Sequence, residues 1–193
     1  DPFGNAVHSI NCFNIIGEDL LITGAGPIGL ISVAICKFIR AKNIVITDIN
    51  DYRLNLAKQL GATKTINTKK DSIKNCFDEL NIKHGFDVGL EMSGNGKAFN
   101  EMLSSIYHGG KIVLLGLLPK STCIDWDNII FKGLQVRGVY GREMYETWYK
   151  MDQLIKSGLD LSKVITHKFS ISSFDEAFKV ISSGQCGKVI MEW

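Results

Sequence analysis

The sequence contains no apolar run that approaches the length of a membrane-spanning helix. It also has little net charge, because 22 Lys and Arg residues oppose 20 Asp and Glu residues without forming a block or stripe. A basic stripe would favour nucleic acid or an anionic membrane surface, so we expect neither as a partner. The first residues, Asp1-Pro2-Phe3-Gly4, show neither the basic region nor the apolar core of a signal peptide, and we expect no leader there.

Cysteine and histidine are few and scattered. The five cysteines are odd in number and form no Cys-x-x-Cys pair, and the four histidines form no His-x-x-x-His pair. The cysteines are Cys12, Cys36, Cys76, Cys123 and Cys186. We therefore predict reduced, buried thiols of a cytosolic protein. Because zinc sites need clustered cysteine, histidine or carboxylate ligands, we predict no metal site in this chain.

Proline is scarce as well, with 3 residues against 19 glycines, a ratio that suits strand-to-helix turns better than a disordered tract. Apolar runs typical of strands alternate with segments of helical periodicity. The predicted strands are residues 19–23, 44–47, 63–67, 86–92, 111–118 and 134–140. The predicted helices are residues 1–16, 27–39, 52–60, 72–80, 99–106 and 143–157.

The strands predict a parallel sheet. Ile112-Val113-Leu114-Leu115 is apolar throughout, as expected of a strand that is buried on both faces. Right-handed crossovers then give an α/β fold, a doubly wound six-stranded Rossmann sheet. We assign residues 1–163 to this domain. Residues 164–193 are predicted to form a strand-helix-strand extension with an apolar surface.

The most informative stretch is Gly24-Ala25-Gly26-Pro27-Ile28-Gly29, which follows an apolar strand and opens a helix. In this G-x-G-x-x-G pattern, Gly24 permits a tight turn, Gly26 lets the backbone approach a pyrophosphate and Gly29 lets the helix pack on the strand. Pro27 suits the first helical position. The free N–H groups of that helix attract phosphate, so the stretch predicts a dinucleotide site.

An acidic residue completes the pattern. Asp48 ends the second strand, 19 residues beyond Gly29, and can accept hydrogen bonds from the adenosine ribose. The carboxylate would repel the extra phosphate of NADP, so we predict that the cofactor is NAD. Arg53 is interpreted as contacting the adenosine end. A glycine turn that binds nothing is the alternative, which the strand, helix and acid together disfavour.

Other candidate residues follow from the rule that doubly wound sheets bind ligands at the carboxyl ends of their strands. Ser93-Gly94, Leu115-Gly116-Leu117 and Val139-Tyr140-Gly141 lie at such ends. Gly116 has two interpretations: it lets a nicotinamide ribose approach the backbone, or it is simply the glycine that ends a strand. Glu91, in an apolar strand, is interpreted as a hydrogen-bonded structural acid rather than a catalyst.

The assembled segments resemble the zinc-dependent medium-chain dehydrogenases. The similarity rests on Asp1-Pro2-Phe3-Gly4-Asn5-Ala6-Val7-His8, the glycine-rich turn, residues 86–94 and, most specifically, residues 140–151. It extends over essentially the whole chain and is strongest to members that act on L-threonine. The resemblance implies oxidation of L-threonine with NAD to L-2-amino-3-oxobutanoate by a cytoplasmic homotetramer.

The resemblance also implies site residues. The NAD-contacting positions are Ile28, Asp48, Arg53, Leu115, Gly116, Leu117, Val139 and Tyr140. Asp1 matches an acidic position of the family's proton relay. The zinc ligands of the family lie in an N-terminal domain that we expect to precede this chain, so this piece alone is expected to be inactive.

Two alternatives stay open. One is another zinc-dependent polyol or secondary-alcohol dehydrogenase of the same superfamily. The other is a non-catalytic NAD-binding module, which the missing zinc ligands favour for these residues taken alone.

Overall fold

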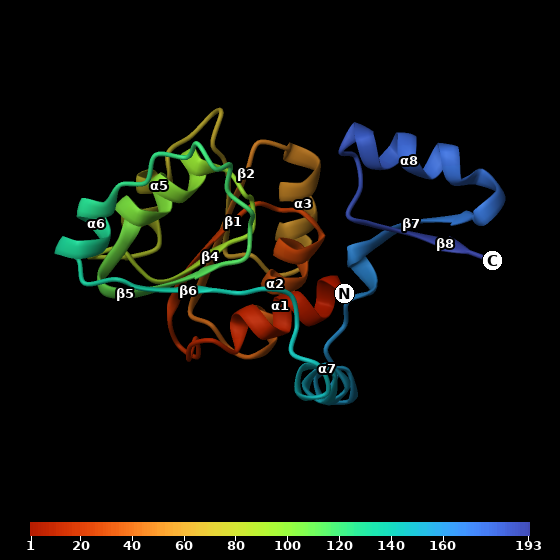
Figure 1. Ribbon diagram of the computed structural model, residues 1–193, viewed down its shortest axis with the longest axis horizontal. Helices are drawn as coiled ribbons and strands as arrows, with labels where there is room; N and C mark the ends of the chain where they lie inside the picture. Colours follow the sequence, from red (N-terminus) through yellow and green to blue (C-terminus); the bar gives the residue numbers. More distant parts are fainter.

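A computed structural model describes residues 1–193, and its centre is a six-stranded parallel sheet in the order β3-β2-β1-β4-β5-β6. Figure 1 shows the helices packed on both faces of this sheet. The strands are β1 (Asp19–Thr23), β2 (Asn43–Asp48), β3 (Lys64–Asn67), β4 (Phe86–Glu91), β5 (Ile106–Leu114) and β6 (Gln135–Gly138). The predicted doubly wound Rossmann sheet is therefore confirmed.

The helices lie between the strands in the predicted alternation. They are α1 (Pro2–Ile10), α2 (Pro27–Phe38), α3 (Asp51–Gln59), α4 (Cys76–Glu79), α5 (Gly96–Ser105), α6 (Trp126–Phe131) and α7 (Glu146–Lys156). A short 3₁₀ turn, Ile73–Asn75, precedes α4 and is capped by the Ser72 side chain. No helix of the chain is long and apolar enough to cross a lipid bilayer.

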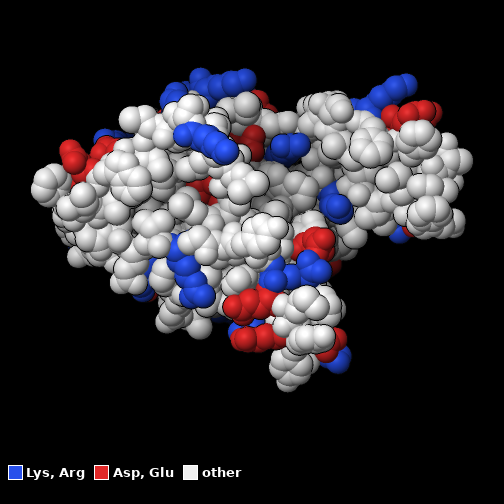
Figure 2. All heavy atoms as spheres, viewed as in Figure 1, with Lys and Arg blue, Asp and Glu red and all other residues white.

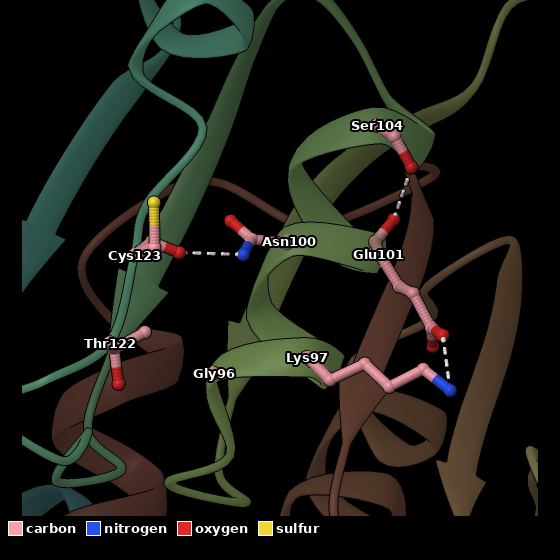
Figure 3. A pocket seen from close by; sticks show the side chains of 7 residues that line it. All are labelled: Gly96, Lys97, Asn100, Glu101, Ser104, Thr122 and Cys123. Carbon is pink, nitrogen blue, oxygen red and sulfur yellow. Dashed lines mark hydrogen bonds and ion pairs between the residues drawn. The ribbon is translucent and has the colours of Figure 1, made fainter.

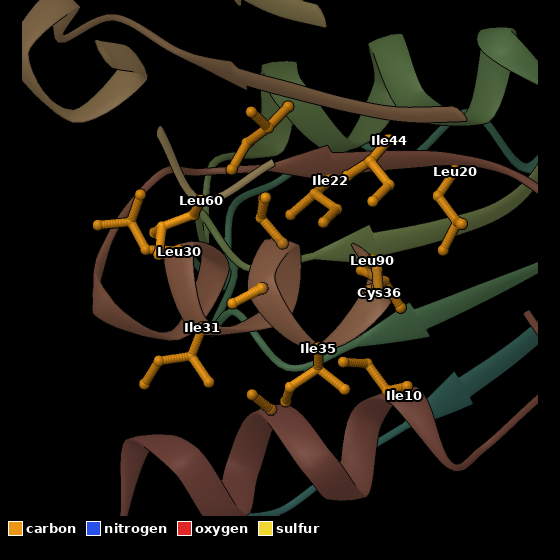
Figure 4. Packing of buried hydrophobic residues seen from close by; sticks show 14 of the residues in the cluster. Ile10, Leu20, Ile22, Leu30, Ile31, Ile35, Cys36, Ile44, Leu60 and Leu90 are labelled. Atoms are coloured by element: carbon orange, nitrogen blue, oxygen red, sulfur yellow. The ribbon is translucent and has the colours of Figure 1, made fainter. Parts of the chain in front are cut away.

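Side chains that alternate along the strands build two cores, one on each face of the sheet. Leu20 and Ile22 of β1 belong to the cluster under α1, α2 and α3, whereas Leu21 belongs to the cluster under α4 and α5. Figure 4 shows the first cluster, where Ile31 and Ile35 of α2 lie between the sheet and α1. Burial on both faces explains why the strand sequences are apolar without alternation.

Several predicted boundaries were wrong. The first helix ends at Ile10, not near residue 16. Strand β5 covers Ile106–Leu114, whereas we predicted a strand at residues 111–118. Helix α5 ends at Ser105, close to its predicted end, and the Lys132 ammonium satisfies its C-terminus by donating to the carbonyls of Leu103, Ser104 and Ile106.

The chain ends in the predicted strand-helix-strand extension. Strands β7 (Ile165–Ser170) and β8 (Lys188–Glu192) pair in parallel, and α8 (Phe174–Ser183) connects them. Figure 1 shows this unit beside α3, outside the main sheet. Six of its large apolar side chains are exposed in the single chain; they are Ile165, Phe174, Phe178, Ile181, Met191 and Trp193.

All five cysteines are free thiols, but they are not all buried. Cys36, Cys76 and Cys186 are buried and Cys12 is partly so, whereas Cys123 is exposed and contradicts the prediction. Cys123 lies in the loop before α6, where the Asn100 amide binds its backbone carbonyl at 2.8 Å. Burial raises the pKa of Cys76 to about 11 and also raises the pKa of Cys36.

These environments predict the order in which the thiols react. At pH 8, a disulfide reagent such as Ellman's should modify Cys123 rapidly, and Cys36 and Cys76 only after denaturation, because the thiolate is the reactive form. Absorbance of the released thiol measures both phases. Cys123→Ser should remove the fast phase alone. A fast phase of unchanged size in that variant would contradict the assigned exposure.

Candidate functional site

A cleft of about 700 Å³ lies at the carboxyl edge of the sheet, where β1, β2, β3 and β4 end. The strand order reverses between β1 and β4, which is where doubly wound sheets bind ligands. The cleft volume falls within the range of ordinary ligand pockets. Its lining residues are Gly24, Gly26, Thr47, Asp48, Ile49, Arg53, Thr68, Lys69, Met92, Ser93, Asn95, Lys97, Ala98 and Glu101.

The glycine turn has the geometry that its sequence predicts. Gly24 has φ +88°, a conformation that other residues rarely adopt. A Cβ at Gly29 would lie 1.9 Å from the Gly24 carbonyl oxygen, so α2 begins in direct contact with the turn. A Cβ at Gly26 would meet nothing within 4 Å, which leaves open space on its cleft side. No side chain caps α2, so its first N–H groups are available to an anion.

The Asp48 carboxylate faces this turn and is held by the backbone. The Ala25 N–H donates to its Oδ2 at 2.6 Å, and the N–H groups of Ile49 and Asn50 donate to its Oδ1 at 2.7 and 2.9 Å. An ionised carboxylate has about four acceptor positions, so it can accept a further hydrogen bond from a hydroxyl. Asp48 is thereby fixed at one rim of the cleft.

Arg53 lines the same rim from the first turn of α3. Its Nε is buried and has no hydrogen-bond partner, which is uncommon for a buried donor. Asn50, the N-cap of α3, accepts from the Arg53 N–H and donates to the Gly184 carbonyl at 3.0 Å. The end of α8 is therefore attached beside the cleft.

Glu91 is fully buried at the end of β4 and accepts hydrogen bonds, as the interpretation of a structural acid requires. Its carboxylate accepts from the Ser93 N–H at 2.9 Å, from the Gly94 N–H at 3.0 Å and from the Thr23 hydroxyl at 3.3 Å. A Cβ at Gly116 would lie 2.1 Å from the Glu91 carboxylate. Close packing is therefore a sufficient reason for glycine at position 116.

Other predicted site residues do not line this cleft. Leu117 and Tyr140 are almost fully exposed, Ile28 is partly exposed in the first turn of α2, and Leu115 and Val139 are partly buried at the ends of β5 and β6. The Asp1 carboxylate contacts the Arg142 guanidinium instead of a cleft residue. The structure brings together Gly24, Gly26, Asp48 and Arg53, and it leaves Asp1 apart from them.

Several lining residues were not singled out from the sequence. Thr68 and Lys69 follow β3, and Lys97 and Glu101 belong to the first turns of α5. The rule of strand carboxyl ends, applied to β3, would have found the first pair. Lys97 and Glu101 carry no such signal, because only the packing of α5 places them at the rim.

A second hollow, of about 570 Å³, lies on the outer side of α5 (Figure 3). Figure 3 shows Asn100 and Glu101 on the helix, with Thr122 and Cys123 on the facing loop. It is lined mainly by polar side chains, lies away from the strand ends and shares Lys97 and Glu101 with the cleft.

The side chains that could bind a metal ion are scattered over the chain. No group of three or more His, Cys, Asp or Glu side chains lies together, so the residues present do not fit a zinc ion. Figure 2 shows basic and acidic side chains interspersed on the viewed face.

With the fold and cleft described, comparison with known proteins defines the class. The sequence profile described as zinc-binding dehydrogenase matches residues 27–157, and the chain belongs to that family. Within it, the chain is similar to the L-threonine 3-dehydrogenase of Chromobacterium violaceum, with 58% identity over all 193 residues. The corresponding enzyme of Burkholderia thailandensis is 55% identical. The chain spans 57% and 56% of the lengths of these relatives.

A solved structure supports the same fold. The protein described as a short chain alcohol dehydrogenase from E. coli CFT073, complexed with NADH, superposes on the whole chain with a TM-score of 0.88. The two sequences are 26% identical, and this chain covers 57% of that one.

The contact between Gly29 and Gly24 predicts a difference between two alanine substitutions. Gly29→Ala should reduce the free energy of unfolding by about 1–3 kcal/mol, because a methyl group would overlap a backbone oxygen. Gly26→Ala should leave that free energy nearly unchanged, since its Cβ has open space. Urea denaturation followed by circular dichroism measures both. Equal stability of the two variants would contradict the described packing.

Proposed function

We propose that this chain binds NAD along the carboxyl edge of its sheet and that its protein oxidises L-threonine with NAD. The products are L-2-amino-3-oxobutanoate and NADH. The observation that carries the proposal is the placement of Asp48. Its carboxylate, held by three backbone N–H groups, shares one cleft with the glycine turn and the uncapped start of α2. The 58% identity to an L-threonine 3-dehydrogenase supports the substrate.

The cleft residues have separate roles in this proposal. The N–H groups at the start of α2 bind the pyrophosphate, and Gly26 lets it approach. Asp48 accepts a ribose hydroxyl, and Arg53, which lines the same rim of the cleft, contacts the adenosine end. Bound NAD supplies a hydride acceptor. Leu115, Gly116, Leu117, Val139 and Tyr140 are proposed to contact the nicotinamide half.

Further parts of the proposal rest on the family resemblance. Asp1 serves in a proton relay, and zinc is held by ligands outside these residues. The protein is a cytoplasmic homotetramer. The domain boundary lies near residue 163, and residues 164–193 pack on the part of the protein that the relatives have in addition. The exposed apolar side chains of that segment, such as Phe178 and Trp193, supply a surface for such a contact.

Asp48 provides the test of nucleotide choice. Asp48→Ala should weaken NAD binding about tenfold, because the ribose loses a hydrogen-bond acceptor. It should also reduce the preference for NAD over NADP, because the charge that repels the extra phosphate of NADP is removed. Isothermal titration calorimetry with both nucleotides measures the effect. Asp51→Ala is the matched control, since Asp51 is an exposed acid paired with Lys70 and does not line the cleft. Unchanged NAD affinity in Asp48→Ala would remove Asp48 from the site.

The substrate is tested on the protein loaded with zinc. L-threonine should reduce NAD, monitored at 340 nm, and L-serine, sorbitol and 2-butanol should be poorer substrates. Turnover of sorbitol or a simple secondary alcohol without turnover of L-threonine would contradict the L-threonine assignment and favour a polyol or secondary-alcohol dehydrogenase. NADH binding without turnover of any alcohol would favour a non-catalytic NAD-binding module.

A further inference from the structure

Glu91 is a buried acid without a charged partner. Its side chain is fully buried, and none of the ion pairs of the chain includes it. Hydrogen-bond donors surround it instead: the hydroxyls of Thr23 and Ser93 and the N–H groups of Ser93 and Gly94. An apolar residue of similar size would leave these buried donors without an acceptor, which is unfavourable.

Glu91 lies at the end of β4, beside the point between β1 and β4 where the strand order reverses. Its partner in β1 is Thr23, the residue before the glycine turn, and its partner in β5 is Leu114. The Glu91 carbonyl accepts from the N–H groups of Leu115 and Gly116 at 3.1 and 3.0 Å. Glu91, the last residue of β4, therefore contacts the ends of both neighbouring strands, β1 and β5.

The turns that follow these strands pack on each other through the same residue. A Cβ at Gly24 would lie 2.9 Å from the Ser93 Cα, so the glycine turn rests on the Ser93 turn. A Cβ at Gly116 would lie 2.3 Å from the Gly94 nitrogen, so the third turn rests on the same segment. Movement of Ser93 and Gly94 would consequently move the cleft walls on both sides.

We propose that Glu91 is a positioning residue of the cofactor cleft, which fixes the turns after β1, β4 and β5 as one unit for nucleotide binding. This inference rests on the proposed binding of NAD. Glu91 cannot touch the nucleotide itself, since no part of it is exposed. It acts by holding the Ser93 and Gly94 backbone, which lies beside the lining residues Gly24, Met92 and Ser93.

The test compares two acid-to-amide substitutions at opposite edges of the sheet. Glu91→Gln removes the charge and places an NH₂ group near the donor N–H of Gly94. Asp19→Asn is the matched control: Asp19 is largely buried at the amino end of β1, where it binds Lys42 and Asn43, each at 2.7 Å. Both variants should lose stability, but only Glu91→Gln should distort the cleft.

NADH fluorescence titration of the protein is the main readout. Glu91→Gln should weaken NADH binding about tenfold, because small displacements of positioning groups carry large losses. Asp19→Asn should stay within about twofold of the wild type. Hydrogen exchange at the Ser93 and Gly94 amides should accelerate in Glu91→Gln and not in Asp19→Asn. Equal NADH affinities of the two variants would overturn the inference while the proposed function stands.

A second variant decides the question if Glu91→Gln does not fold. Thr23→Val keeps the side-chain shape and removes one hydroxyl donor to Glu91, and Thr23 does not line the cleft. It should weaken NADH binding about threefold, in keeping with one hydrogen bond. Unchanged affinity in a folded Thr23→Val would overturn the inference. Wild-type protein that fails to bind NADH would overturn the proposed function and this inference together.

Discussion

The close approach of α2 to the end of β1 is the contact on which the site depends. At Gly29 there is no room for a side chain, because the carbonyl oxygen of Gly24 occupies that space. The contact fixes the direction of α2, whose uncapped amino end then faces the cleft. The same turn offers the Ala25 N–H to Asp48, so helix, turn and acidic residue form one rigid rim.

Backbone N–H groups hold both acidic side chains at the carboxyl edge of the sheet. Three N–H groups hold the Asp48 carboxylate, and two N–H groups with two hydroxyls hold the Glu91 carboxylate. Since backbone donors are fixed by the sheet itself, the two acids need no cationic partners to be placed. Asp48 faces the cleft, where it can bind a ligand. Glu91 lies beneath the cleft, where it can only hold the backbone that forms the cleft wall.

Much of this site could be predicted because its signals are local. Gly24, Gly26 and Asp48 occupy fixed places relative to a strand, a turn and a helix, and local spacing brings them to one cleft. Asp1 was assigned by resemblance alone, and its partner in the structure is Arg142, 141 residues away in the chain. The group that satisfies the C-terminus of α5 is likewise distant in sequence, because it is the ammonium of Lys132.

The sequence by itself determined the alternation of strands and helices, the parallel sheet and the dinucleotide-type turn, because apolar periodicity and glycine spacing act over short stretches of chain. Only the tertiary structure decided which groups donate to Glu91, what Gly116 packs against, which residues of α5 reach the cleft, and that Cys123 is exposed. Those outcomes depend on contacts between elements far apart in the chain, and no local sequence pattern reveals such contacts.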